Sequence, residues 1–148
     1  MINLRGRAER SFWLFEAETC ERLGITLLNL RLSALQPPSR ETLLALIEVM
    51  DNLERPALIH CKSGADRTGL AAAIWQMTQM EMSADQAMAQ LSWRYVHFRS
   101  SAAGMVDQIL RSYAAQTAQT GSSFRDWVSR SYEPDQIRSD FALWRGRG

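Results

Sequence analysis

This sequence has almost no net charge, few cysteines and no long apolar run. Its 148 residues include 17 basic and 16 acidic side chains, so the net charge is only +1. This balance excludes a generally basic nucleic-acid-binding protein and an acidic tail. No apolar run approaches the length of about 18 residues that crosses a membrane. The polar residues 1–7 do not form a secretory signal.

Cysteine and histidine each occur twice, which argues against a disulfide scaffold and against a metal site. Two cysteines are too few for a disulfide scaffold and favour a reducing, cytoplasmic location. The two histidines form no cluster with metal-ligand spacing, so we expect no metal and no organic cofactor. The length predicts one domain that spans residues 1–148. Lysine occurs once, at Lys62, inside the segment that carries the chemistry.

Hydrophobic periodicity predicts that strands and helices alternate in the first half of the chain. Strand-type apolar runs occur at residues 2–4, 25–32 and 57–60. Helical spacing follows them at residues 13–23, 39–53 and 69–80. Further helix starts are indicated at Ser83, Ala102, Ser123 and Glu133. The sequence therefore predicts an α/β domain with a central, mostly parallel sheet flanked by helices and a helical C-terminal half.

Residues 60–69 read His-Cys-Lys-Ser-Gly-Ala-Asp-Arg-Thr-Gly and join a predicted buried strand to a predicted helix. In such a loop several backbone N–H groups converge at a helix N-terminus, where the helix dipole favours a phosphate-like dianion. The guanidinium of Arg67 suits bidentate binding of the same anion. The positive potential should hold Cys61 as a thiolate, which is an activated nucleophile beneath a bound phosphoryl group.

This segment resembles the Cys-x5-Arg signature of the cysteine-dependent protein tyrosine phosphatase superfamily. It matches the fuller form His-Cys-x-x-Gly-x-x-Arg-[Ser/Thr]-Gly at every specified position. Residues 2–5, Ile-Asn-Leu-Arg, resemble a strand that family members write as Val-Ile-Asn-Leu-Arg. Over roughly residues 1–100 the chain is similar to the dual-specificity-phosphatase-like branch, in a bacterial form with Asp before the signature Arg.

The resemblance implies a role for each residue of the loop. Cys61 would attack phosphorus and form a cysteinyl-phosphate. Arg67 and the N–H groups of residues 62–67 would bind the phosphoryl oxygens, Thr68 would help the thiolate leave, and His60 would orient the loop. The implied substrate-binding residues are His60, Lys62, Ser63, Gly64, Ala65 and Arg67.

The general acid departs from the family pattern. Relatives place an aspartate about thirty residues before the cysteine, but no Asp or Glu occurs between Glu21 and Glu41. We favour Asp66 as the substitute, because inositol-lipid-type cysteine phosphatases carry an acid-assigned Asp just before the arginine. Two alternatives stay open. In the first, Asp66 only stabilises the helix start or pairs with an arginine. In the second, Glu41 reaches inward from a shifted loop and acts as the acid.

The N-terminus also departs from the pattern. Relatives have another strand and helix before the Ile-Asn-Leu-Arg strand, so we expect that the domain here lacks these elements. An upstream anchor or export signal would lie outside this sequence.

Three kinds of function follow. The first is a phosphomonoester hydrolase acting on a phosphoprotein or small phosphate ester, with an inositol-phosphate or phospholipid phosphatase as a variant. Lys62 favours that variant because the loop resembles Cys-Lys-Ser-Gly-Lys-Asp-Arg, although Ala65 replaces the second lysine. The second is a catalytically weak module that binds phosphorylated ligands. The third is sulfur transfer on Cys61. No nucleic acid and no membrane span are expected.

Two secondary features have competing interpretations. Cys20 lies at core spacing on a predicted helix, where a small buried side chain is the ordinary interpretation and a redox partner for Cys61 is the alternative. The run from Arg94 to Arg99 mixes basic and aromatic residues. It is either a helix end with Tyr95 and Phe98 packed inward or a border of the pocket that grips a substrate phosphate.

Overall fold

Three short parallel strands form the centre of the computed structural model, which describes residues 1–146. They are β1 (Ile2–Asn3), β2 (Leu28–Asn29) and β3 (Ile59–His60), in the order β2-β1-β3. Backbone pairing extends beyond these bounds, since Leu32 N–H donates to Leu4 O at 3.1 Å. The predicted strand over residues 25–32 is thus confirmed in place but is regular over a shorter span. Asn3, Asn29 and His60 lie in register at the carboxyl ends.

Helices make up most of the rest of the molecule. They are α1 (Ser11–Arg22), α2 (Arg40–Asp51), α3 (Asp66–Gln79), α4 (Ala84–Ala87), α5 (Met105–Thr120), α6 (Phe124–Arg130) and α7 (Pro134–Arg145). Short 3₁₀ turns occur at η1 (Met88–Gln90), η2 (Trp93–Tyr95) and η3 (Ala102–Gly104). The predicted α/β architecture with a helical C-terminal half is confirmed.

Serine side chains start three of these helices, as the sequence predicts. Ser39, Ser83 and Ser123 each accept a hydrogen bond from the backbone N–H three residues later. At Ser83 the side chain of Gln86 returns a bond to the serine backbone, which completes a capping box. These caps satisfy N–H groups that have no partner within the helix.

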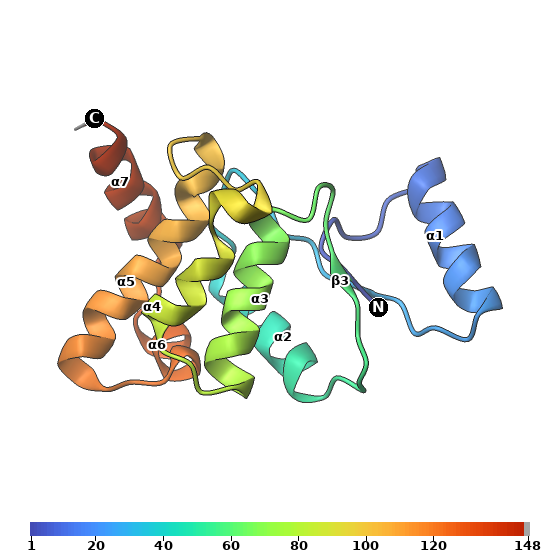
Figure 1. The fold of residues 1–148 in the computed structure, drawn as a ribbon, viewed down its shortest axis with the longest axis horizontal. Helices are drawn as coiled ribbons and strands as arrows, with labels where there is room; N and C mark the ends of the chain where they lie inside the picture. Colours follow the sequence, from blue (N-terminus) through green and yellow to red (C-terminus); the bar gives the residue numbers. More distant parts are fainter. Residues whose placement is uncertain (147–148) are drawn as a thin grey trace.

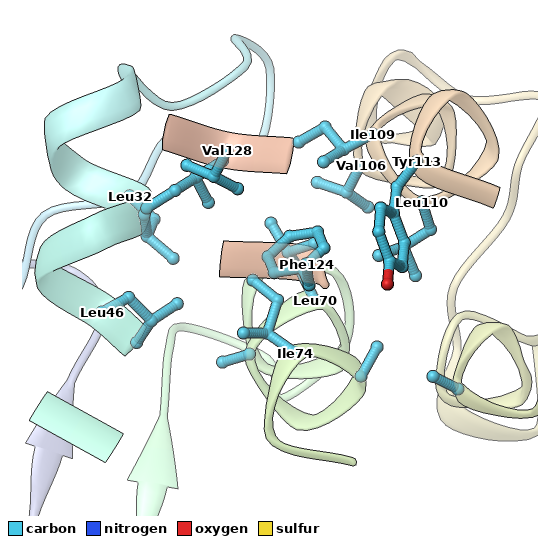
Figure 2. Close-up of a cluster of buried hydrophobic side chains, with 14 of the residues drawn as sticks. Leu32, Leu46, Leu70, Ile74, Val106, Ile109, Leu110, Tyr113, Phe124 and Val128 are labelled. Atoms are coloured by element: carbon cyan, nitrogen blue, oxygen red, sulfur yellow. The ribbon is translucent and has the colours of Figure 1, made fainter. Parts of the chain in front are cut away.

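The hydrophobic core lies between helices α2, α3, α5 and α6. Figure 2 shows side chains from these helices meeting, with Leu46, Ile74, Ile109 and Val128 among them. Each of these four is fully buried. Phe124, Trp127, Tyr132 and Phe141 are also buried, whereas Trp144 on α7 is exposed and stacks on Phe141.

Helix α1 lies on the other side of the strands from the helical body (Figure 1). Cys20 is its only buried residue, and it is a free thiol. Phe12, Leu14, Phe15 and Leu23 are exposed. Helix α1 therefore meets the rest of the protein along one narrow edge. Within residues 1–146 no helix has the length and apolar character needed to span a membrane.

Candidate active site

The signature loop lies between β3 and α3, at the carboxyl ends of the parallel strands (Figure 1). His60 ends β3 and Asp66 begins α3, so residues 61–65 make the turn. Ligands of α/β folds bind at this edge of the sheet, where a helix N-terminus faces the end of a strand. The topology therefore brings the predicted residues together in one loop.

Two glycines of the signature have distinct structural reasons. Gly64 has a φ of +74°, a left-handed conformation that glycine adopts without steric cost. Gly69 lies on the first turns of α3, where an added Cβ would come within 2.9 Å of both Gln90 O and Leu91 Cδ2. The first glycine shapes the loop, and the second lets α3 approach the segment that leads to His97.

The sulfur of Cys61 is buried among hydrogen-bond donors. Burial of the thiol opposes its ionisation. The nearby hydroxyl of Thr68 and the backbone N–H groups of Ser63, Thr68 and Gly64 stabilise the thiolate and outweigh that effect, so the pKa of Cys61 lies below that of an ordinary thiol. The loop therefore favours a thiolate at this position.

Arg67 lies beside the segment where relatives carry their acid loop. Its Nη1 donates to Leu32 O at 3.5 Å, and its buried Nε makes no hydrogen bond within residues 1–146. No carboxylate of the described chain forms an ion pair with it. The guanidinium keeps donors that a phosphoryl group can use.

Asp66 has a partner that neither sequence interpretation proposed. Its Oδ1 lies 2.7 Å from Nδ1 of His97, and Nε2 of His97 lies 2.5 Å from Oδ2 of Asp107. The prediction that Asp66 pairs with an arginine is wrong. Asp66 is nevertheless in the first turn of α3, where a carboxylate is favourable.

Glu41 stands outside the site. It is exposed on the first turn of α2, where its own backbone N–H and the Ser39 hydroxyl lower the pKa of its carboxyl. The open possibility that Glu41 reaches inward is therefore not what the structure shows. Asp66 is the acidic residue that the loop itself supplies.

His60 connects the loop to α1. Its Nδ1 lies 3.3 Å from Cys61 O, and its Nε2 lies 2.9 Å from Oε1 of Glu16. Glu16 also accepts hydrogen bonds from Asn3 at 2.9 Å and from Arg5 at 3.1 Å. No motif in the sequence singles out Glu16, which lies four residues before the buried Cys20 on α1.

The remaining loop residues differ in exposure. Lys62 and Ser63 are exposed, and Ala65 is buried. Lys62 forms no ion pair with the described residues, so its side chain is free to meet a substrate. Among residues 1–146, no three or more His, Cys, Asp and Glu side chains are grouped to hold a metal ion.

The run from Arg94 to Arg99 borders a cavity of about 500 Å³, which His97, Arg99 and Arg111 help to line. Tyr95 and Phe98 are exposed, so the prediction that they pack inward is wrong. His97 takes the inward position instead, since Val96 before it turns the chain with a φ of +60°.

Comparison with known proteins agrees with this geometry. Residues 1–108 match the family PTP-NADK, described as DSP-PTPase phosphatase fused to NAD+ kinase. A stretch of 54 residues is 39% identical to the tyrosine-protein phosphatase cdc-14 of Caenorhabditis elegans. That stretch is 36% of this chain and 8% of the relative's length. No solved structure matches the chain. Because the family match covers most of the sequence, the chain belongs to the PTP-NADK family of dual-specificity and tyrosine phosphatase domains.

Proposed function

We propose that the protein hydrolyses phosphomonoesters through a cysteinyl-phosphate intermediate. The observation that carries the proposal is the position of Cys61, which is buried between the end of β3 and the N-terminus of α3, where the Thr68 hydroxyl and loop N–H groups lower the pKa of its thiol. Arg67, on the first turn of α3, forms no ion pair with the described residues, and its buried Nε makes no hydrogen bond with them. A low-pKa thiolate beside anion-binding donors is the arrangement that nucleophilic attack on a phosphoryl group requires.

The reaction has two steps. In the first, the Cys61 sulfur attacks phosphorus, an S–P bond forms, and the P–O bond to the leaving group breaks. Asp66, in its protonated form, gives its proton to the departing oxygen. In the second, water attacks phosphorus, the S–P bond breaks, Asp66 takes a proton from the water, and inorganic phosphate is released. The Thr68 hydroxyl stabilises the departing thiolate.

The substrate class is a phosphoprotein or a small phosphate ester. The match to a dual-specificity phosphatase family supports phosphorylated substrates in general. Exposed Lys62 adds a positive charge next to Cys61, which favours substrates with more than one negative group.

Hydrolysis of para-nitrophenyl phosphate without added metal tests the proposal. We expect Cys61→Ser to reduce kcat by roughly a thousandfold or more, because it removes the nucleophile. Cys20→Ser is the matched control, since Cys20 is the other free thiol and lies on α1. Circular dichroism would verify that each variant is folded.

Two outcomes would contradict the proposal. Activity that survives in Cys61→Ser would exclude the cysteine mechanism. A folded parent protein that binds inorganic phosphate but releases none from the ester would instead be a phosphate-binding module.

A further inference from the structure

A buried histidine connects the signature loop to helix α5. His97 has no exposed side-chain surface, and each ring nitrogen faces a carboxylate. Nδ1 lies 2.7 Å from Asp66 Oδ1, on the first turn of α3. Nε2 lies 2.5 Å from Asp107 Oδ2, on the first turn of α5.

This geometry sets the protonation of the ring. A doubly protonated ring donates from both nitrogens, so it can pair with one oxygen of each carboxyl group and leaves the second oxygen of Asp66 able to carry a proton. Burial lowers the pKa of His97, but its hydrogen bonds to Asp107 and Asp66 outweigh that effect and raise it. The other charged groups beside it are Arg99 and Arg111, which line the neighbouring cavity.

The backbone before His97 supports a dedicated role. Val96 is a β-branched residue in the left-handed region, with a φ of +60° and a ψ of +26°. Such a conformation is rare for this residue type and persists only when surrounding contacts hold it. The turn sends His97 inward, and His97 N–H donates to Ser92 O at 3.1 Å.

The consequence for Asp66 is a fixed orientation. Oδ1 is held by His97, whereas Oδ2 makes no hydrogen bond within the described part of the chain. Asp66 directly precedes Arg67, so the free oxygen belongs to the same turn as the phosphate-binding guanidinium. When Oδ2 gives up a proton, the carboxylate that forms is already paired with a buried imidazolium.

We propose that His97, held by Asp107, is a positioning residue that fixes Asp66 so that its free oxygen protonates the leaving group. This proposal rests on the general-acid role proposed for Asp66. The proton moves from Asp66 Oδ2 to the leaving oxygen as the P–O bond breaks, and water returns a proton in the second step. His97 keeps both of its protons throughout.

Two substitutions separate the two bonds of His97. The amide nitrogen of Asn in His97→Asn lies near the position of Nδ1 and keeps a donor for Asp66. The amide nitrogen of Gln in His97→Gln lies near the position of Nε2 and keeps a donor for Asp107 alone. The readout is kcat/KM on phenyl phosphate, a poor leaving group, relative to para-nitrophenyl phosphate.

We expect Asp66→Asn to lower this ratio about a hundredfold, because only the poor leaving group needs the acid. His97→Gln should lower it about tenfold, and His97→Asn less. In the Asp66→Asn background, His97→Gln should cause no further change in the ratio. Asp107→Asn should lower the ratio in the same direction as His97→Gln.

Equal losses on both substrates in His97→Gln, adding fully to those of Asp66→Asn, would overturn the positioning role and leave the acid role of Asp66 intact. Equal losses on both substrates in Asp66→Asn would overturn the acid role and, with it, this proposal. The ¹⁵N shifts of the His97 ring give a readout independent of activity. Two protonated nitrogens at neutral pH are expected, and a neutral ring would overturn the proposal.

Discussion

The ionisation of Cys61 depends on one hydroxyl more directly than on any other side chain. The Thr68 hydroxyl lowers the pKa of the thiol, and the other groups that lower it are backbone N–H groups. A hydrogen bond to a charged group is worth about 1.5–3 kcal/mol. Removing it in Thr68→Val should raise the pKa of Cys61, because the thiolate loses stabilisation while burial still opposes it.

The rate of alkylation by iodoacetamide as a function of pH measures this effect. Because the pKa of Cys61 is lowered in the folded protein, the parent should react at pH values where ordinary thiols are protonated. In Thr68→Val the inflection should move to higher pH, and the rate near pH 6 should fall about tenfold. Thr68→Ser keeps the hydroxyl and should resemble the parent. Identical profiles for Thr68→Val and the parent would contradict the assignment.

Residues of the site were predictable where they are contiguous in sequence. Cys61, Asp66, Arg67 and Thr68 fall within one strand–loop–helix segment, whose pattern indicates anion binding without any further structure. His97 was not predictable, because it lies 31 residues from Asp66 in the chain. The two side chains meet only because the segment that follows η2 folds back onto the first turn of α3.

The helices carry most of the tertiary structure, and a buried hydroxyl joins the turn between α6 and α7 to the segment before α2. Tyr132 follows α6, is fully buried, and donates to Pro38 O at 2.7 Å. Burial raises the pKa of its phenol, so the hydroxyl stays a donor at physiological pH. Tyr132→Phe leaves a buried carbonyl without a partner and should lower the free energy of unfolding by about 2 kcal/mol.

Urea unfolding measures this loss as a shift of the midpoint at unchanged slope. The matched control is Tyr113→Phe, since Tyr113 donates to Ser122 O at the longer distance of 3.2 Å and is slightly more exposed. Its loss should be smaller. If Tyr113→Phe lowered the free energy of unfolding as much as Tyr132→Phe, the greater burial of the Tyr132 hydroxyl would make no difference to stability.

Element prediction succeeded where caps and breakers stand in the sequence. Ser39, Ser83 and Ser123 mark helix starts because their hydroxyls compete for N–H groups at those positions. The regular strands are shorter than the apolar runs, because ordered pairing extends only as far as a neighbouring strand does. The first residues of helices were therefore more predictable from the sequence than the lengths of strands.

The whole molecule divides into a packed helical body and a peripheral helix α1 (Figure 1). The outer edge of β3 faces an apolar cavity of about 520 Å³ that Ile59 and Trp75 help to line. Sequence periodicity could not reveal the exposure of α1, because it marks an apolar face without showing what covers it.

Helix α1 is held mainly by polar contacts, and this predicts uneven stability across the molecule. Glu16 binds Asn3 and Arg5 and lies against His60, whereas Cys20 alone is buried. Elements with few buried apolar side chains open locally at lower free energy than the core. In native-state hydrogen exchange, the amides of α1 should be less protected than those of α3 by a factor of about a hundred.

Replacing Glu16 should widen the difference in amide protection between α1 and α3 without unfolding the helical body. In Glu16→Gln we expect faster exchange throughout α1 and unchanged exchange in α3 and α5, because the ion pair with Arg5 and the contact with His60 are weakened. Glu18→Gln, on the exposed face of the same helix, is the matched control and should have no effect. Equal protection of α1 and α3, or equal effects of the two substitutions, would mean that α1 opens only with the whole protein. The position of His60 beside Cys61 would then be fixed by the core and not by Glu16.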